Sequence, residues 1–252
     1  GNAQSFGDLL NDEVDYGDAP DSYQTLNASD GARHNAFPTL FLGGATDGDA
    51  DGQPGILANG DDTDAEGDDE DGVTLPNPLV TNTTASVTVN ASAAGKIDGW
   101  VDFNNNGNFS DAGEKVFNNV AVTAGNNNLS FAVPNGATPS NTYARFRISS
   151  VGGLAPTGLA ADGEVEDYAV QIVNTQFSIN DPSVTEGNAG TSNLVFTVTR
   201  SNNASACSVN YAITGGTATV ADLDYQALAA GTLTFTAGGA LTATITVVVN
   251  GD

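Results

Sequence analysis

The sequence predicts an all-β protein built from two tandem β-sandwich domains, residues 1–173 and 174–252. Apolar residues recur at every second position in ten short segments, and clusters of Gly, Asn, Pro and Ser separate these segments. No stretch of ten or more residues has the apolar spacing of a helix. A hydrophobic content of 39% supports two sandwich cores if the outer faces of the sheets are solvated.

Five of the alternating segments lie in the first domain. They are ASVTVNAS (85–92), KIDGWVDF (96–103), LSFAVP (129–134), TYARFRIS (142–149) and EDYAVQIV (166–173). In the second of them, the alternation places Ile97, Val101 and Phe103 on one face, which we expect to be buried.

The other five alternating segments follow Asn174. They are QFSIN (176–180), NLVFTVTR (193–200), CSVNYAIT (207–214), GTLTFTA (231–237) and LTATITVVVN (241–250). A seven-stranded sandwich would need two more strands than these. We therefore expect either that the chain was cut within this domain or that another chain fills the gap.

Charge excludes several classes of partner. The chain has 31 acidic and 6 basic side chains, for a net charge of −25. Nucleic acids and anionic membranes both require basic surface, so neither is an expected partner.

No run of about 18 apolar residues is present, so we expect no membrane insertion. With a single Cys, at position 207, the chain forms no internal disulfide.

Composition also bears on location. Met is absent, even at the first position, so we expect a processed or excised piece of a longer product. Tiny residues, Thr and Asn dominate, and Lys is nearly absent. We interpret this pattern as that of a bacterial secreted or cell-surface protein, stabilised by something other than disulfides.

The segment GWVDFNNNGNFSDAGEKV, residues 99–116, has the spacing of a calcium-binding loop. Asp102, Asn104 and Asn106 stand at positions 1, 3 and 5, and a Gly follows at position 6. The flanks are strands rather than helices, and the last carboxylate comes one residue after the usual twelfth position. The alternative is a long hairpin loop that is rich in Asn because Asn tolerates left-handed backbone. The candidate ligands are Asp102, Asn104, Asn106, Asn108, Asp111 and Glu114.

A second candidate lies in residues 47–72, which hold 11 acids and no base. The usual interpretation of such a run is a solvated acidic linker. The spacing in DGDADG, however, again places Asp at alternate positions before a Gly, as a Ca²⁺ loop does. The candidate ligands here are Asp47, Asp49, Asp51, Asp61, Asp62, Asp64, Asp68, Asp69 and Asp71.

A third candidate lies in the second domain. Its residues Glu186, Asp222 and Asp224 are in loops that would share a cation if they met at one tip of the sandwich.

Catalytic signals are weak. His34 is the only histidine, and no Ser or Cys stands near it in the sequence. Nucleophile-elbow, phosphate-loop and Cys–His zinc motifs are absent. Pairs of carboxylates are numerous enough to arise by chance, so we expect a protein that is not an enzyme.

Several ordered motifs resemble a known family. Residues from about 13 to 173 resemble the GEVED domain of bacterial extracellular proteins, in DYGDAPDSYQT, GARH, GDDEDGV, GWVDFNNNGNFSDAGE, YARFRIS and GEVEDY (163–168). The resemblance implies a secreted or cell-surface location more than a mechanism, because the family's activity is poorly defined.

Residues from about 175 to 252 resemble the Calx-β domain, in SVTEGNAG, LVFTVTRS, VNYAITGGTATVADLDYQ and GTLTFTAGGALTATITVVV. This resemblance implies an immunoglobulin-like sandwich that binds Ca²⁺ at one tip. It maps the calcium-binding acids onto Glu186, Asp224 and Asp252. The family's last acidic motif and final strands are missing, so a complete ion site in this domain requires ligands from a neighbour.

These observations lead to one functional hypothesis and one alternative. We expect a non-enzymatic, calcium-stabilised extracellular protein, either an adhesin segment or a surface-fibre subunit, with Ca²⁺ as its cofactor and an unidentified surface or matrix ligand. Copies would form a homopolymer if one chain donated a strand to the incomplete second domain of the next. The first 14 residues are the nearest candidate donor. The alternative is a carbohydrate- or ligand-binding module, for which Trp100 would be the aromatic contact.

Overall fold

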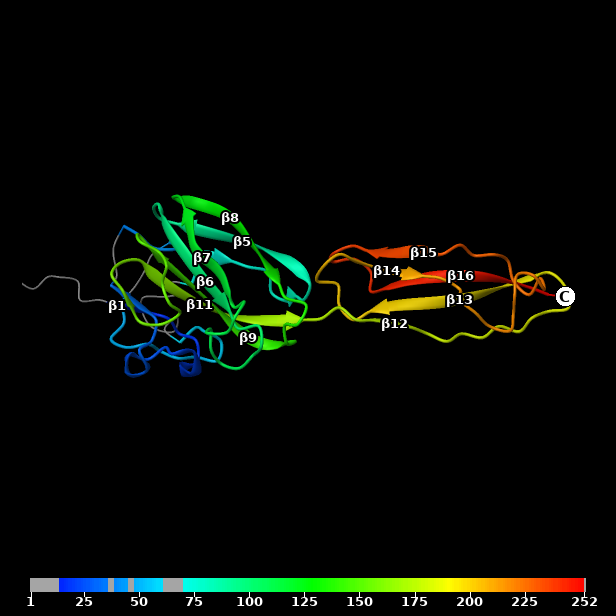
Figure 1. The fold of residues 1–252 in the computed structure, drawn as a ribbon, viewed down its shortest axis with the longest axis horizontal. Coiled ribbons are helices and arrows are strands. Elements are labelled where there is room, and N and C mark those ends of the chain that lie inside the picture. Colours follow the sequence, from blue (N-terminus) through cyan, green and yellow to red (C-terminus); the bar gives the residue numbers. More distant parts are fainter. Residues whose placement is uncertain (1–13, 36–38, 45–47, 61–69, 252) are drawn as a thin grey trace, which may run out of the picture. The chain divides into compact units, whose positions relative to one another are not determined.

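The computed structural model describes residues 14–35, 39–44, 48–60 and 70–251 of the 252-residue chain. Its regular structure is almost entirely β, which confirms the predicted all-β fold (Figure 1). The chain divides into two compact units, Gly1–Val173 and Asn174–Asp252. In the described ranges, no helix has the length and apolar character needed to cross a membrane.

The first unit contains eleven strands and two 3₁₀ helices among its described residues. In chain order they are β1 (Val14–Tyr16), η1 (Asp21–Tyr23), η2 (Asn27–Ser29), β2 (Arg33–Asn35), β3 (Val73–Thr74), β4 (Leu79–Val80), β5 (Thr83–Ala91), β6 (Gly95–Val101), β7 (Lys115–Val122), β8 (Gly125–Val133), β9 (Ser140–Ser149), β10 (Leu159–Ala160) and β11 (Glu164–Val173). The strands that the alternation predicts correspond to β5, β6, β8, β9 and β11.

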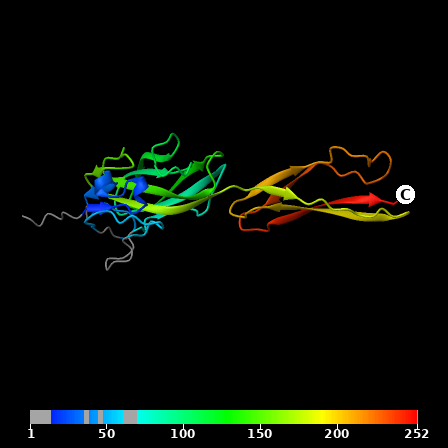
Figure 2. The ribbon, with the colours of Figure 1, turned by 90° about the horizontal axis from the view of Figure 1, so that it is seen from below.

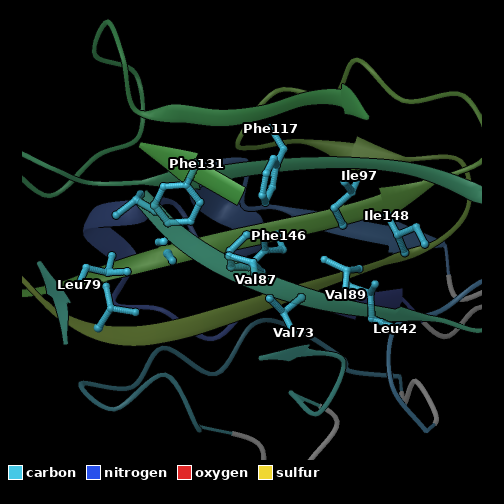
Figure 3. Packing of buried hydrophobic residues seen from close by; sticks show 14 of the residues in the cluster. Leu42, Val73, Leu79, Val87, Val89, Ile97, Phe117, Phe131, Phe146 and Ile148 are labelled. Carbon is cyan, nitrogen blue, oxygen red and sulfur yellow. The ribbon is translucent and has the colours of Figure 1, made fainter. Parts of the chain in front are cut away.

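Two sheets of this unit pack face to face as a sandwich. The larger sheet has the order β4-β11-β9-β6-β7, and the smaller has the order β3-β5-β8. Val87 and Phe131 of the smaller sheet pack against Phe146 and Ile148 of the larger one (Figure 3). The face predicted for the second alternating segment is confirmed, because the three apolar residues named for it are all buried in this core.

The opposite face of the larger sheet is covered rather than solvated. A third sheet of order β1-β2-β10 contacts β11 of the larger sheet, and Tyr23 of η1 packs against Trp100. Trp100 of β6 is buried there with Ala19, Tyr23 and Phe109. The expectation of solvated outer faces is therefore wrong for this sheet. The covering segment, residues 14–35, has no periodic pattern of its own, so its packing on a sheet was not predictable from the sequence.

The second unit is an open two-layered arrangement of five strands. They are β12 (Phe177–Ile179), β13 (Thr191–Arg200), β14 (Cys207–Tyr211), β15 (Gly231–Phe235) and β16 (Thr242–Asn250). One sheet has the order β12-β13-β16, and the other pairs β14 with β15. Val198, Phe235 and Ile245 are buried between them. In Figure 2 the segment between β14 and β15 (orange) arches away from β13 and β16.

Candidate metal-binding loop

The loop that joins β6 to β7, residues 102–114, is closed by the carboxylate of Asp102. This side chain is fully buried. Its Oδ1 accepts a hydrogen bond from the backbone N–H of Asn105 at 2.6 Å. Its Oδ2 accepts one from the N–H of Gly107 at 2.9 Å and one from the Tyr23 hydroxyl at 2.7 Å. Gly107 has φ +85°, a left-handed conformation that Gly adopts without strain, so the bend needs this residue. We call residues 102–114 the Asn-rich loop.

Alternate side chains of the Asn-rich loop meet at Asp111. Its Oδ2 accepts hydrogen bonds from Nδ2 of Asn104 at 3.0 Å and Nδ2 of Asn106 at 2.6 Å. These two bonds lower the pKa of the Asp111 carboxyl. Asn108 donates its Nδ2 to Oδ1 of Asn106 at 2.7 Å. The two-residue spacing read in the sequence therefore does bring these polar side chains together.

Glu114 lies at the end of the Asn-rich loop and is only 2% exposed. Its Oε2 accepts a hydrogen bond from the Asp111 N–H at 3.2 Å. Its Oε1 is buried and has no hydrogen-bond partner in the described part of the chain. Burial, together with the nearby charges of Asp102 and Asp111, raises the pKa of this carboxyl to about 7. The site therefore holds more negative charge than its own hydrogen-bond donors satisfy.

A cavity of about 260 Å³ adjoins Glu114. Its lining residues come from the Asn-rich loop and from the turn after β8. They are Phe103, Asn104, Ala112, Gly113, Glu114, Pro134, Gly136 and Ala137. The space is large compared with the roughly 30 Å³ that one water molecule occupies in the liquid. An ion and its waters would fit beside the buried carboxylate.

The donor set of this loop fits a hard cation. Its carboxylate, amide and backbone oxygens are the ligands that Ca²⁺ prefers. Within the ranges that the structure describes, no three His, Cys, Asp or Glu side chains form a metal-binding group on their own. Both oxygens of Asp102 are already engaged, in four hydrogen bonds. The residues best placed to hold an ion are therefore Glu114 and Asp111, together with Asn104 and Asn106 after rotation of their amides.

The acidic block contributes few described carboxylates. Asp49 accepts a hydrogen bond from the Gln53 side chain, Asp51 from the N–H of Asn27, and Asp71 from the N–H of Gly44. Asp51 and Asp71 therefore each hold a different segment outside the block, whereas Asp49 bonds within it. Six candidate ligands of the block lie outside the described residues: Asp47, Asp61, Asp62, Asp64, Asp68 and Asp69.

In the second unit, two of the predicted ligands share one groove. Glu186 and Asp224 both line it, together with Asp181. Asp224 accepts a hydrogen bond from the Thr219 N–H at 2.6 Å. Asp222 is exposed and accepts one from the Thr219 hydroxyl at 2.8 Å, so it stabilises its own turn. Asp252 lies outside the described residues.

The GEVEDY motif has a structural role that sequence reasoning missed. Glu164 and Glu166 lie at the start of β11 and are both buried. Glu164 accepts a hydrogen bond from the backbone N–H of Leu42, and Glu166 accepts one from the N–H of Gly72 at 2.8 Å. The motif thus attaches two distant loop segments to the sandwich. Its alternation was visible in the sequence, but its partners were not.

Asp167 of the same motif attaches a third segment. It binds Arg145 of β9 and also accepts a hydrogen bond from the N–H of Ala19 at 2.9 Å. Arg145 donates further hydrogen bonds to the carbonyls of Tyr23 and Pro156. A buried charge is tolerated when it is paired and fully hydrogen-bonded, as this one is.

The single histidine is also structural. His34 is completely buried, with Nδ1 2.7 Å from the carbonyl oxygen of Asp162 and Nε2 2.9 Å from Nε of Arg147. Because Arg147 can only donate, Nε2 must accept and Nδ1 must carry the proton. Burial and the Arg147 charge lower the pKa of His34 well below its usual value. His34 is therefore neutral and fixed in one tautomer.

Trp100 offers no face for stacking on a sugar. It is 2% exposed, and the Lys115 ammonium lies 4.9 Å from the centre of its ring. Its role in the first unit is to anchor the covering segment on the larger sheet.

Comparison with known proteins identifies one part of the chain. No curated protein matches the sequence. A family model matches residues 96–171, which lie within the first unit, so the resemblance of the second unit to Calx-β stays a prediction. The matched residues include the Asn-rich loop and the GEVEDY motif. The model is that of the GEVED domain, and this part of the chain is similar to GEVED domains.

Proposed function

We propose that this protein is a non-enzymatic structural module of an extracellular protein and that its Asn-rich loop binds Ca²⁺. One observation carries the proposal. The Glu114 carboxylate is buried, its Oε1 has no hydrogen-bond partner among the described residues, and it stands near two other acids. Such a group favours a bound cation, because pairing a buried charge removes a penalty of several kcal/mol.

Calcium would stabilise the fold through this loop. Glu114 and Asp111 supply two carboxylates, and the loop's amides and carbonyls supply neutral oxygens, a mixture typical of Ca²⁺ sites. A ligand that binds only the folded state stabilises it by about 2.7 kcal/mol at 100 times its Kd. In a chain with a net charge of −25 and one cysteine, the ion would supply the cross-link that disulfides supply elsewhere.

The proposed location follows from the same chemistry. Calcium-binding modules of extracellular proteins have Kd values on the order of 10⁻⁴–10⁻³ M, which suit millimolar calcium outside cells. Similarity to the GEVED domain supports a secreted or surface protein. Within this class, an adhesin segment or a fibre subunit is the function that we propose. The carbohydrate-binding alternative has less support, since Trp100 is buried.

Thermal unfolding of the full chain tests the proposal. We expect 10 mM CaCl₂, about 10 to 100 times such a Kd, to raise Tm by about 3–10 °C over EDTA, the shift that roughly 1.4–2.7 kcal/mol produces in a chain of this size. Glu114→Gln should lose most of this gain, while in EDTA it should be at least as stable as the parent because the buried charge is gone. Asp30→Asn is the matched control, since it also removes one charge but lies outside the loop, in an ion pair whose Asp side chain is 70% exposed.

A local measurement separates this loop from the acidic block. Tb³⁺ occupies Ca²⁺ sites and luminesces when a nearby Trp or Tyr is excited. Trp100 pairs with Lys115, the residue after Glu114, and Tyr23 donates to Asp102. We expect sensitised emission from the parent and from Asp30→Asn but not from Glu114→Gln. Equal calcium shifts and equal emission in all three proteins would contradict the proposal.

A further inference from the structure

The chain contains four Asn-Gly dipeptides, and they differ in how the fold holds them. They are Asn59–Gly60, Asn106–Gly107, Asn135–Gly136 and Asn250–Gly251. In such a pair the backbone nitrogen of Gly can attack the side-chain amide carbon of Asn, because Gly has no side chain to hinder the approach and its backbone rotates easily. The reaction therefore depends on whether the fold restrains that nitrogen.

In three of the four pairs the Gly N–H is held by a hydrogen bond. The donors are Gly60, Gly107 and Gly251, and their acceptors are, in the same order, Oδ2 of Asp18 at 2.7 Å, Oδ2 of Asp102 at 2.9 Å and the carbonyl oxygen of Gly190 at 2.9 Å. In two of these pairs the Asn side chain is held as well. Asn106 donates to Asp111, and Asn250 donates to the carbonyl oxygen of Leu223. These bonds must break before the nitrogen can attack, so the fold protects the three pairs.

The fourth pair lies in the turn between β8 and β9. The turn is closed by a hydrogen bond from the Ala137 N–H to the carbonyl oxygen of Pro134 at 3.1 Å. Within the ranges that the structure describes, the Gly136 N–H donates no hydrogen bond. Asn135 and Gly136 are both exposed, and no atom beyond its chain neighbours lies within 4 Å of the position that a Cβ on Gly136 would take. The Gly136 nitrogen is therefore unrestrained and has room around it.

We propose that Asn135 is a site of spontaneous deamidation in the folded protein. The Gly136 nitrogen loses its proton to hydroxide and forms a bond to Cγ of Asn135. The side-chain nitrogen takes up a proton and leaves as ammonia, so a five-membered succinimide remains. One water molecule then opens the ring at either carbonyl and gives aspartate or isoaspartate at this position.

The modification changes the charge beside the candidate cation site. Either product adds one negative charge to the turn, and isoaspartate also adds one methylene to its backbone. Pro134, Gly136 and Ala137 of this turn line the cavity that adjoins Glu114. The new charge therefore arises at the border of that cavity, and its formation does not depend on calcium binding there.

Peptide mapping by mass spectrometry tests the proposal. The full chain is incubated at pH 8.5 and 37 °C and then digested with pepsin in acid, where succinimide formation is slow. We expect a gain of about 1 Da at Asn135, at least tenfold faster than at Asn59, Asn106 or Asn250. The chain unfolded in urea is the control. There the four sites should convert within about threefold of one another, because the protecting hydrogen bonds are lost.

Two glycine variants test the role of the Gly136 nitrogen. Gly136→Ala places a methyl group beside this nitrogen and should slow conversion at Asn135 at least fivefold. The fold should accept the change, since nothing lies within 4 Å of the added Cβ and φ is outside the left-handed region. Gly55→Ala is the matched control. Its added Cβ would have its nearest neighbour, the Gly60 nitrogen, at 3.5 Å, and it should leave the rate at Asn135 unchanged.

Either of two results would overturn the proposal. The first is conversion at Asn135 in the folded chain that is no faster than at the other three sites, because the fold would then protect all four. The second is an equal rate in the parent and in Gly136→Ala, because the side-chain amide would then be hydrolysed directly rather than attacked by the backbone.

Discussion

Asp167 and Arg145 stand directly opposite each other on β11 and β9 and form a bidentate ion pair in a fully buried position. Oδ1 of Asp167 accepts from Nε of Arg145 at 2.7 Å, and Oδ2 accepts from Nη2 at 2.7 Å. Two parallel bonds of this kind fix geometry as well as charge. The pair joins two strands of the larger sheet and also holds the covering segment, so we assign it a central role in the stability of the first unit.

Asp167→Asn should destabilise the first unit strongly. The change leaves the Arg145 guanidinium buried with no counter-charge, which typically costs about 3–5 kcal/mol. The matched control is Asp30→Asn, which breaks an ion pair with Arg33 in which the Asp side chain is 70% exposed, and should cost less than about 1 kcal/mol. Urea denaturation followed by Trp100 fluorescence measures both. Similar losses in the two variants would show that the buried pair contributes little.

The protein should lose stability as the pH falls below about 6.5, because of His34. Its pKa is lowered in the folded state, so the unfolded chain binds a proton more readily. The contribution is fully present above the unfolded pKa and is lost as pH falls below it.

His34→Gln tests this pH dependence. The variant should unfold with a smaller loss of stability between pH 7.5 and pH 5.5 than the parent, as measured by urea denaturation at each pH. Glu114 changes protonation in the same range with the opposite sign, but it contributes equally to both proteins. Parallel pH profiles would contradict a neutral, buried His34.

Gly163→Ala should destabilise the start of β11. Gly163 has φ +95°, and an added Cβ would overlap the carbonyl oxygen of Ile148. The backbone conformation alone costs about 1–3 kcal/mol for a residue with a side chain. Gly136→Ala is the matched control, because nothing lies within 4 Å of its added Cβ and its φ is not in the left-handed region. Chemical denaturation should show a clear loss only for the first variant; equal midpoints would contradict this role of Gly163.

The sequence was most informative about one face of each strand. Alternation correctly placed Ile97 and Phe103 in the core, because a half-buried strand repeats every two residues. Arg145 and Arg147 lie on the other face of β9 and are buried as well. What covers the other face depends on a non-periodic segment more than 100 residues earlier in the chain, and single-sequence patterns do not report such pairings.

The candidate site was predictable in part. Local spacing anticipated that Asn104 and Asn106 would meet Asp111, because all three belong to one short loop. Spacing did not reveal that both carboxylate oxygens of Asp102 accept hydrogen bonds from the backbone of the loop. It also did not reveal that Glu114 is the buried carboxylate with one oxygen that lacks a hydrogen-bond partner among the described residues. Burial and hydrogen-bond satisfaction depend on the Tyr23 segment and the turn after β8, which pack on the loop from elsewhere.

Anomalous X-ray scattering from crystals grown with Ca²⁺, or with Tb³⁺ in its place, tests the calcium proposal most directly. We predict a peak in the Asn-rich loop within about 2.3–2.6 Å of Glu114 Oε1, with Asp111 and loop amide or carbonyl oxygens completing the shell. Peaks confined to other acidic segments, with none beside Glu114, would contradict the account.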